Sequence, residues 1–456
     1  MQDRQGVTRE RAQRILARER DAFVAARPKS QALSAQAVQH LLFGVPLHWM
    51  NDWSTPFSLY VDAARGAAFT DVDGHRYIDF CLGDTGAMFG HAPPAVAQAI
   101  ARQAQRGFTT MLPGEDAVAV SAALARRFGL PYWQFAMTAS DANRFALRWA
   151  RAATGRDKIV VFNGCYHGTV DDVFVDLVDG RPTQRASLLG QVHDLLPHTR
   201  VVEFNDLDAL AHALADGEVA CVLAEPAMTN VGMVLPDPGF WREAQALMKR
   251  HGTLLLIDET HTISSSPRGY AREHGIEPDL FVLGKPVGGG VPCAVYGFSA
   301  ELAARVQQAK LDAPPGHSGI GTTLTANALS MSAMRATLDE VMTDAAYAHM
   351  FALAERLAQG LTATIARHAL PWCVTRVGAR SEFQFCATPP RNGSEARAAM
   401  DDDLEHLIHL YLLNRGVLIT PFHNMMLVCP ATTEADVERL IGAFNACLEE
   451  LCAQQK

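Results

Sequence analysis

The sequence predicts an α/β protein with a large, doubly wound domain around a mostly parallel sheet and a smaller α+β domain formed by the N- and C-terminal segments. Short apolar runs recur between residues 95 and 341, and patterns typical of amphipathic helices separate them. After Val341 the order of elements changes to long helices around a single strand. We therefore assign residues 91–340 to the large domain, and residues 1–90 and 341–456 to the small one.

The large sheet is expected to contain strands at residues 158–162, 219–226, 253–259, 280–284 and 294–299. Each run is short and rich in aliphatic residues, as strands buried on both faces are. Amphipathic helices are expected between the strands, including residues 141–153 and 239–252, and Gly252 is expected to cap the second helix. Strands that alternate with helices pair in parallel, because the helix carries the chain back along the sheet.

The terminal segments predict the elements of the small domain. Residues 58–80 alternate apolar and polar side chains around an Asp73–Gly74 turn, which is a hairpin signal. Near the N-terminus, an amphipathic helix would place Val7, Ile15, Leu16 and Phe23 partly on one face. The C-terminal segment is expected to form helices at 345–370, 401–416 and 434–451, and a strand at 374–385.

Composition excludes several classes of function. The 456-residue chain has 40 Lys and Arg against 49 Asp and Glu, a net charge of −9 that argues against a nucleic-acid surface. No apolar run approaches the roughly 20 residues that span a bilayer, and the charged N-terminus lacks the apolar stretch of a secretory signal. The nine cysteines form no CxxC pair, so neither a zinc site nor a disulfide framework is predicted. We expect a cytoplasmic protein without a metal.

The stretch DLFVLGKPVGGG, residues 279–290, places Lys285 directly after an expected core strand and before three glycines. Buried lysines are rare unless they are paired or chemically used, and glycines let a ligand approach the backbone. The chain has no GxGxxG, GxxxxGK[ST] or GxSxG motif, so a dinucleotide site, a P-loop and a nucleophile elbow lack support. Lys285 is therefore a candidate for covalent chemistry.

Three further features belong with Lys285 chemically. Asp258 ends an expected buried strand, at the edge where open α/β sheets bind ligands. Ala139 and Ser140 begin an expected helix, whose free amides and dipole suit a phosphate. Tyr166 follows another strand and offers an aromatic face to a planar ring. A lysine that forms an imine, a carboxylate for a ring nitrogen, a phosphate cup and a stacking ring describe a pyridoxal phosphate site.

Each of these features also has a structural explanation. Lys285 could be a solvated loop residue, and Asp258 with its neighbour Glu259 could cap a helix or pair at the surface. Tyr166 could belong to the core, and Ser140–Asp141 is a typical helix N-cap. The combination of all four features, each at a strand end, favours the cofactor site.

From about Gly44 to the C-terminus, the sequence resembles class III, fold type I pyridoxal phosphate aminotransferases, in the branch that contains glutamate-1-semialdehyde aminomutase. The segments that carry the resemblance are FTDVDGHRYIDF, CYHG, AEPAMTNVGMVLP, LLLIDET, GYAREHGIEPDLFVLGKPVGGGVP and GTTLTANALSM. The resemblance implies pyridoxal 5'-phosphate as the cofactor, a fold type I architecture and a homodimer.

The resemblance also implies roles around the cofactor ring. Lys285 matches the lysine that forms the internal aldimine, and Asp258 matches the carboxylate that holds the pyridine nitrogen protonated. Tyr166 matches the aromatic residue stacked on one ring face, and these three are the predicted catalytic residues. Thr260 would lie on the opposite face, where the family usually has valine, and His167 is expected to contact the cofactor.

The remaining predicted cofactor residues surround the phosphate and the ring hydroxyl. Ala139 and Ser140 match the phosphate cup, although the usual Gly-Thr pair is altered. Glu225 and Asn230 match a supporting carboxylate and an asparagine near the ring hydroxyl. Thr323 matches the residue that reaches the phosphate bound in the neighbouring subunit.

Departures from the aminomutase concern the substrate. The resemblance places Met50 where the aminomutase has a carboxylate-binding arginine, Met425 at about the position of a glutamate, and Asp84 in place of a rim aromatic. These departures argue against that aminomutase activity. The residues that suggest a wider apolar pocket are Trp49, Trp53, Met50 and Phe422, although loop aromatics also pack structurally.

Arg380 is the candidate partner of a substrate carboxylate, because the matching strand faces the cofactor in relatives and usually carries no charge there. An ion pair of Arg380 with Glu382 or another acid is the alternative.

The function predicted from these residues is an aminotransferase that exchanges an amino group between an amine or amino acid and a keto acid or aldehyde. A non-alpha or beta-amino acid is favoured as the donor. The alternative on the same chemistry is an isomerase, either an aminomutase or an amino-acid racemase. A protein that binds the cofactor without catalysis is a third possibility, against which the presence of both Lys285 and Asp258 argues.

Overall fold

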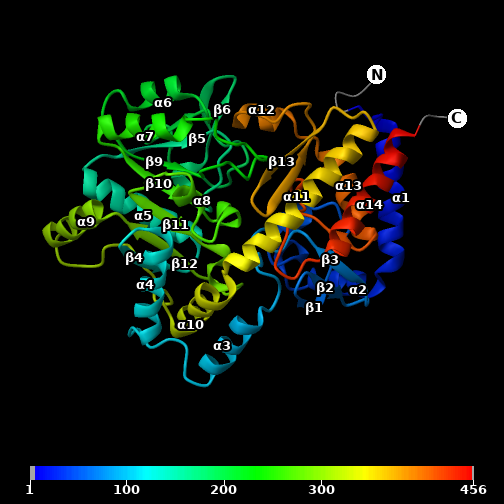
Figure 1. The fold of residues 1–456 in the computed structure, drawn as a ribbon, viewed down its shortest axis with the longest axis horizontal. Helices are drawn as coiled ribbons and strands as arrows, with labels where there is room; N and C mark the ends of the chain where they lie inside the picture. Colours follow the sequence, from blue (N-terminus) through cyan, green and yellow to red (C-terminus); the bar gives the residue numbers. More distant parts are fainter. Residues whose placement is uncertain (1–5, 454–456) are drawn as a thin grey trace. The chain divides into compact units, whose positions relative to one another are not determined.

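The computed structural model describes residues 6–453, and the chain divides into two compact units. The small unit comprises Met1–Pro93, Ala345–Pro389 and Ala399–Lys456, and the large unit comprises Pro94–Asp344 and Pro390–Ala398. Figure 1 shows the elements of both units. The segment Pro390–Ala398 falls within the range assigned to the small domain from the sequence, yet it packs on the large unit. At Gly393 a Cβ atom would lie only 1.9 Å from the Asn163 carbonyl oxygen, so this close approach requires glycine.

A seven-stranded sheet forms the centre of the large unit. In spatial order its strands are β4 (Tyr132–Ala136), β12 (Ala294–Phe298), β11 (Leu280–Leu283), β10 (Leu254–Asp258), β9 (Val219–Ala224), β5 (Lys158–Phe162) and β8 (Thr199–Val202). β12 runs antiparallel to both of its neighbours, and the other pairs are parallel. The predicted mostly parallel sheet is confirmed.

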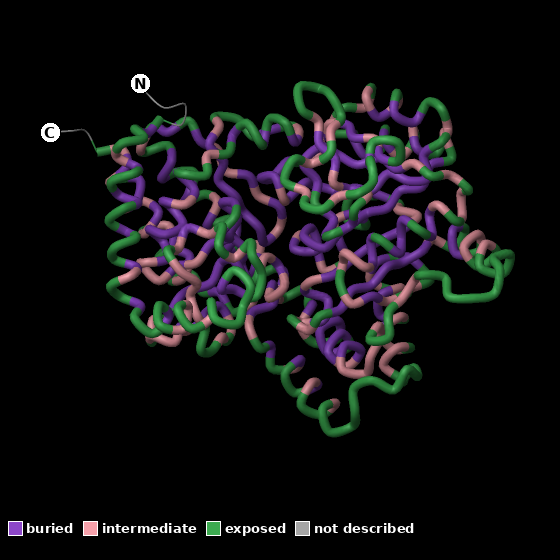
Figure 2. Tube along the Cα trace, turned by 180° about the vertical axis from the view of Figure 1, so that it is seen from behind, coloured by how far each residue is buried: buried purple, intermediate pink, exposed green. Residues whose placement is uncertain are grey.

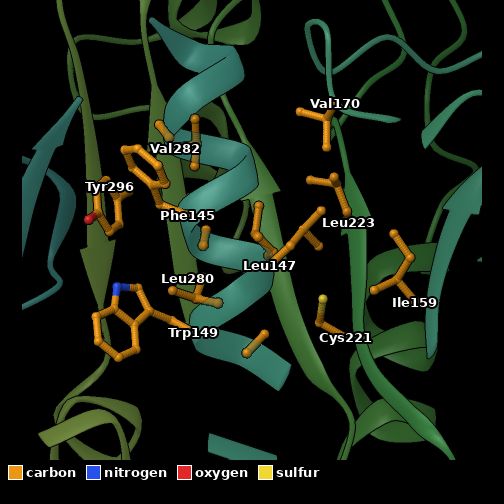
Figure 3. Packing of buried hydrophobic residues seen from close by; sticks show 14 of the residues in the cluster. Phe145, Leu147, Trp149, Ile159, Val170, Cys221, Leu223, Leu280, Val282 and Tyr296 are labelled. Carbon is orange, nitrogen blue, oxygen red and sulfur yellow. The ribbon is translucent and has the colours of Figure 1, made fainter. Parts of the chain in front are cut away.

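Both faces of this sheet are buried. Ile159 and Val161 of β5 belong to the hydrophobic cluster beneath helix α5, whereas Val160 and Phe162 belong to the cluster beneath α6 and α7. Successive side chains of a strand point to opposite faces, so one apolar run supplies both clusters. Figure 3 shows α5 lying over the strands, with Phe145 and other side chains directed into the first cluster. Helices on both faces make the sheet doubly wound.

The helices that cover the large sheet are α5 (Ala139–Thr154), α6 (Leu207–Leu214), α7 (Phe240–His251) and α9 (Ala300–Asp312). The other elements of the large unit are α3 (Pro94–Ala104), α4 (Glu115–Phe128), η3 (Asp171–Val173), β6 (Val175–Val178), β7 (Arg181–Gln184), η4 (Thr262–Ser265), α8 (Tyr270–Glu273), η5 (Lys285–Gly288), α10 (Ala328–Ala336), η6 (Thr337–Val341) and α12 (Gly393–Ala398).

The small unit contains two sheets, with strand orders β1-β2-β3-β15 and β13-β14-β16. Its helices are α1 (Arg9–Ala26), α2 (Pro28–Ala37), η1 (Leu42–Gly44), η2 (His48–Asp52), α11 (Asp344–Arg367), α13 (Asp402–Asn414) and α14 (Glu434–Cys452). Its strands are β1 (Val61–Arg65), β2 (Ala68–Asp71), β3 (Arg76–Asp79), β13 (Cys373–Val377), β14 (Arg380–Gln384), β15 (Val417–Leu418) and β16 (Met425–Leu427).

Two predictions about the small unit have different outcomes. The amphipathic N-terminal helix is confirmed for Ile15, Leu16 and Phe23, which are buried on one side of α1, whereas Val7 is buried but precedes the helix. The single strand predicted at 374–385 is wrong, because the segment is a hairpin in which β13 and β14 pair antiparallel. Gly378 has a φ of +59°, in the left-handed region, and lets the chain reverse between the two strands.

Figure 2 shows the inner strands of the large sheet as buried and the segment between α3 and α4 as largely exposed. Among residues 6–453, no helix is long and apolar enough to cross a membrane. In the same range, no group of three or more His, Cys, Asp and Glu side chains could hold a metal ion.

Candidate active site

The residues predicted to do chemistry gather at the carboxyl edge of the large sheet. Asp258 is the last residue of β10, and Lys285 follows β11 by two positions. β10 and β11 pair in parallel, so their carboxyl ends lie at the same edge. Tyr166 and His167 follow β5, whose end lies at this edge as well. Crevices at this edge bind ligands in open α/β sheets.

Asp258 is a buried carboxylate that accepts three hydrogen bonds. Its Oδ2 accepts from Asn143 Nδ2 at 2.8 Å and from His167 Nδ1 at 3.0 Å, and its Oδ1 accepts from the Thr260 amide at 3.0 Å. Burial would raise the pKa of the Asp258 carboxyl, but these hydrogen bonds hold that pKa below its usual range. Asp258 therefore keeps its negative charge at neutral pH.

His167 balances this charge. Its side chain is buried, and burial would lower the pKa of the imidazole, but the hydrogen bond to Asp258 raises that pKa above its usual value. Asn143 supports the arrangement, because its Nδ2 also donates to the His167 carbonyl oxygen at 3.0 Å. The carboxylate is thus held in one orientation by neighbours on α5 and after β5.

Lys285 is half-buried at the start of η5 and has a φ of +43°. A left-handed conformation costs a non-glycine residue about 1–2 kcal/mol, so the surrounding structure must hold it. Its Nζ lies 2.7 Å from His261 Nε2. At the preceding Gly284 a Cβ atom would lie 2.8 Å from the Ala139 Cβ, so only glycine lets this turn approach the start of α5 so closely.

The start of α5 lies at the carboxyl edge of the sheet, where Ser140 and Gly168 form a small cradle. Thr138 is the N-cap of α5, because its Oγ1 accepts from the Asp141 amide at 3.1 Å. The N-cap is therefore Thr138 and not Ser140–Asp141, as considered from the sequence. Ser140 Oγ accepts from the Thr169 amide at 3.0 Å. A Cβ atom at Gly168 would lie 2.1 Å from Ser140 Oγ. The first amides of a helix have no intrahelical partner and favour an anion.

The other predicted cofactor residues lie in the same unit. The Tyr166 side chain is 38% exposed, while Thr260 is buried and its Oγ1 accepts from the Gly284 amide at 3.2 Å. Glu225 is buried and accepts a hydrogen bond from the Thr229 hydroxyl. Asn230 is half-buried, and Thr323 is exposed on the loop before α10.

Three residues near the site were missed from the sequence. Asn143 is a polar residue on the otherwise apolar face of α5, a position that could have marked it. His261 contacts Lys285, but only its place three residues after Asp258 hinted at this. Glu259 is buried and accepts from the Tyr270 and Ala271 amides, both at 2.7 Å, and burial raises the pKa of its carboxyl to about 7.

The residues predicted to contact the substrate belong to the small unit. Trp49 is 41% exposed and its ring lies 5.7 Å from that of Trp53, between centroids. Phe422 is 44% exposed, and Met50 and Asp84 are half-buried. Asp84 has a φ of +47°, which places it in a tight turn.

Arg380 is completely buried in the small unit. Its Nη2 donates to the Thr85 hydroxyl, one residue from Asp84. Glu382, considered as its ion-pair partner, instead contacts His423 Nδ1 at 3.0 Å through its Oε1. The ion pair of Arg380 with an acid stays a prediction, although Glu382 has His423 as a partner.

The donor set of the large unit fits pyridoxal 5'-phosphate. An ionised carboxylate with fixed orientation suits a protonated ring nitrogen, and the cradle at Gly168 and Ser140 suits a phosphate. An amine at the same edge of the sheet, on Lys285, suits the aldehyde.

Comparison with known proteins identifies the family. The family model for class III aminotransferases matches residues 49–448. The chain belongs to the class III aminotransferase family. A glutamate-1-semialdehyde 2,1-aminomutase from Chloroflexus aggregans is 34% identical over 408 residues, which cover 86% of this chain and 91% of the relative.

Solved structures of class III enzymes agree with this assignment. The crystal structure of a glutamate-1-semialdehyde-aminomutase from Pseudomonas aeruginosa PAO1 is 52% identical, with a TM-score of 0.96, and covers 98% of this chain and 100% of its own. A lysine-to-alanine variant of a glutamate-1-semialdehyde-aminomutase from the same organism, solved in complex with PMP, matches with the same identity, coverage and TM-score. The fold is therefore fold type I, and pyridoxal 5'-phosphate is the cofactor of this class III protein.

These relatives correct the predicted function. The prediction of an aminotransferase is wrong, because the curated relative and both solved structures are aminomutases. The findings favour the isomerase alternative. The error came from giving Met50, Asp84 and Met425 too much weight: single replacements in a pocket change what the pocket binds, whereas the fate of the amino group depends on the whole site.

Proposed function

We propose that this protein is a pyridoxal phosphate-dependent 2,1-aminomutase, an isomerase that acts on an amino aldehyde of the glutamate 1-semialdehyde class. The observation that carries the proposal is the match, at 52% identity over 98% of the chain, to a structure described as a glutamate-1-semialdehyde-aminomutase. The charged and nucleophilic side chains at the edge of the large sheet support it, because an aminomutase needs the same proton transfers as other enzymes with this cofactor.

Lys285 and Asp258 are the proposed catalytic residues. The cofactor, when bound, supplies an electron sink that acidifies the C–H bond beside the amino group. Asp258, held ionised by its three hydrogen bonds, would keep the ring nitrogen protonated. The Lys285 amine would remove and return the proton at the substrate carbons. The variant solved in complex with PMP, in which alanine replaces a lysine, supports a lysine as the key residue of the relative's site.

The other residues of the large unit would hold the cofactor. Ala139 and Ser140, at the start of α5, would bind the phosphate through their amides. Tyr166, the third predicted catalytic residue, would stack on one face of the ring, and Thr260 would lie on the other. His167 would act through Asp258, to which it is hydrogen-bonded.

The roles of Glu225, as a supporting carboxylate, and of Asn230, near the ring hydroxyl, stay predictions. Burial of Glu225 and its contact with Thr229 favour a fixed orientation for its carboxylate.

The substrate residues stay predictions. Trp49, Met50, Asp84 and Phe422 are proposed to border the substrate pocket, and the exposure of Trp49 and Phe422 is compatible with that role. For Arg380, complete burial and the bond to Thr85 favour a part in shaping the turn that carries Asp84 over direct contact with a carboxylate.

We also propose a homodimer in which Thr323 reaches the partner's phosphate site. The loop of Thr323 lies beside exposed apolar side chains: Leu324 is 51% exposed, and Phe108, Met111 and Leu112 are 47%, 78% and 75% exposed. The Ala328 amide donates to the Phe108 carbonyl at 2.8 Å, which connects the two segments. A cluster of exposed apolar side chains favours burial against another chain.

A single-substrate assay tests the proposed function. The holoenzyme is incubated with glutamate 1-semialdehyde alone, and products are resolved by NMR and chiral chromatography. An aminomutase forms a regioisomer of unchanged mass without a second substrate, and Lys285→Ala abolishes its formation. Turnover that appears only when a keto acid is added, or that yields the enantiomer instead, would contradict the proposal.

A further inference from the structure

The His261 imidazole and the Lys285 amine meet at the carboxyl edge of the large sheet. Nε2 and Nζ lie 2.7 Å apart. β10 and β11 pair in parallel, with Asp258 opposite Val282. His261 and Lys285 each follow these paired residues by three positions, so the register of the two strands brings the side chains together.

Both residues are held in place by backbone hydrogen bonds around them. The Glu259 amide donates to the Val282 carbonyl at 2.9 Å, which extends the strand pairing toward the site. The Ser264 amide donates to the His261 carbonyl at 3.2 Å, at the start of η4. His261 is only 6% exposed, and Lys285 has the constrained φ of +43°. The 2.7 Å contact therefore joins two side chains that extend from well-fixed backbone.

The chemistry of the contact restricts its protonation. A lysine ammonium has only donors, so a neutral imidazole nitrogen must accept from it. An imidazolium beside an ammonium would bring two donors and two positive charges together at this distance. A hydrogen bond between the two nitrogens therefore requires that one of them is a neutral acceptor.

The two carboxylates that precede His261 in the chain accept hydrogen bonds of their own. Asp258 accepts from Asn143, His167 and the Thr260 amide, and Glu259 accepts from amides at the start of α8.

We propose that His261 is a positioning residue for Lys285. Its Nε2 holds the amine at the strand end and takes up the proton that the amine must lose before it can act as a nucleophile or base. In this transfer an Nζ–H bond breaks, an Nε2–H bond forms, and the positive charge moves to the imidazole, while the electron pair of the broken bond stays on Nζ. The inference rests on the proposed function, in which Lys285 is the reactive amine.

The first test measures the titration of Lys285 in the apoprotein. Reductive methylation with formaldehyde and cyanoborohydride at a series of pH values measures the fraction of each amine that is neutral. Mass spectrometry then distinguishes methylation of Lys285 from that of the five other lysines of the chain. In His261→Phe the ammonium loses its acceptor, so the midpoint of Lys285 should fall by about 1–2 pH units. His261→Gln keeps an acceptor and should retain the wild-type midpoint. His212→Gln, on the exposed side of α6, is the control.

The second test separates positioning from proton uptake in the holoenzyme. A glutamine side chain can accept a hydrogen bond but cannot take a proton at neutral pH. His261→Gln should bind pyridoxal 5'-phosphate as the wild type does and turn over about 100-fold more slowly. His261→Phe should lose cofactor affinity as well.

The outcomes distinguish this inference from the proposed function. If the methylation midpoint of Lys285 is unchanged in folded His261→Phe, the inference is overturned. If His261→Gln turns over at the wild-type rate, the proposal that His261 takes up the proton is overturned. If His261→Phe does not fold, His261→Asn, whose shorter side chain withdraws the acceptor, replaces it. Turnover by Lys285→Ala would overturn the proposed function instead, and the apoprotein titration would still decide whether His261 holds the Lys285 amine.

Discussion

Replacing Asp258 by asparagine should impair catalysis far more than folding. The carboxylate accepts from three N–H groups, those of Asn143, His167 and Thr260. An amide offers one acceptor oxygen, and its NH2 group is itself a donor. At least one of these buried groups therefore loses its partner in Asp258→Asn.

The size of each effect follows from these contacts. Losing one buried hydrogen-bond partner costs about 1–3 kcal/mol in the free energy of unfolding. The local charge balance is preserved, because His167, whose pKa Asp258 holds up, becomes neutral when the carboxylate is gone. Turnover loses the charge beside the ring nitrogen and should fall by about 100-fold or more.

The pH dependence of stability gives an independent check. The Asp258 carboxyl has a lower pKa in the folded protein than in the unfolded chain. Its charge therefore adds to the free energy of unfolding at pH values above the unfolded pKa, about 3.9. This contribution is lost as the pH falls through the folded pKa. The difference in stability between wild type and Asp258→Asn should therefore shrink below about pH 4.

Urea unfolding of the apoproteins and steady-state turnover of the holoenzymes supply the measurements. Asp279→Asn is the matched control, because this residue precedes β11 at the opposite edge of the same sheet and its carboxylate accepts from the Leu255 amide at 2.9 Å. Turnover of Asp258→Asn within tenfold of the wild type would refute the reasoning, as would a loss equal to that of Asp279→Asn.

Three further predictions follow from other parts of the chain. Gly168→Ala should weaken pyridoxal 5'-phosphate binding at least about tenfold, because the added Cβ would lie 2.1 Å from Ser140 Oγ; wild-type affinity in equilibrium dialysis would contradict this. Burial raises the pKa of Glu405 to about 8. Because the unfolded chain releases this proton at lower pH than the folded protein, the free energy of unfolding should fall as the pH rises from about 4.5 to 8. Urea unfolding should show Glu405→Gln more stable than wild type at pH 8 by about 2–4 kcal/mol, and an identical pH slope would exclude the effect. Mixed dimers of Lys285→Ala and Thr323→Val chains should regain one working site, and proven subunit exchange without recovered turnover would count against the shared site.

Much of the fold was predictable because its signals are local. The apolar run at residues 158–162 indicated a strand buried on both faces, and alternate residues of β5 do enter two separate clusters. The run at 374–385 misled, because a hairpin whose strands are both partly apolar reads as one long strand, and only Gly378 marked the reversal. The segment 390–398 carried no signal of where it packs.

The candidate site was predictable at the positions where a strand end coincides with an unusual residue. Lys285 and Asp258 were found in this way, and the structure places both at one edge of the sheet. Asn143 was missed because a polar residue within a helix has many explanations until its partner is known. His261 was missed because it lies in the turn after Asp258, and its contact with Lys285 depends on how β10 pairs with β11.

The sequence by itself determined the doubly wound architecture, the cofactor and the strand ends that carry Lys285 and Asp258. These follow from residue types and from periods of two and 3.6 residues, which a chain segment expresses without reference to distant segments. Only the tertiary structure decided which groups touch. Asn143 meets Asp258 across 115 positions of the chain, and the His261–Lys285 contact depends on the register of β10 against β11. Such contacts are a few ångströms wide and are set by how strands and helices pack, so no local pattern encodes them.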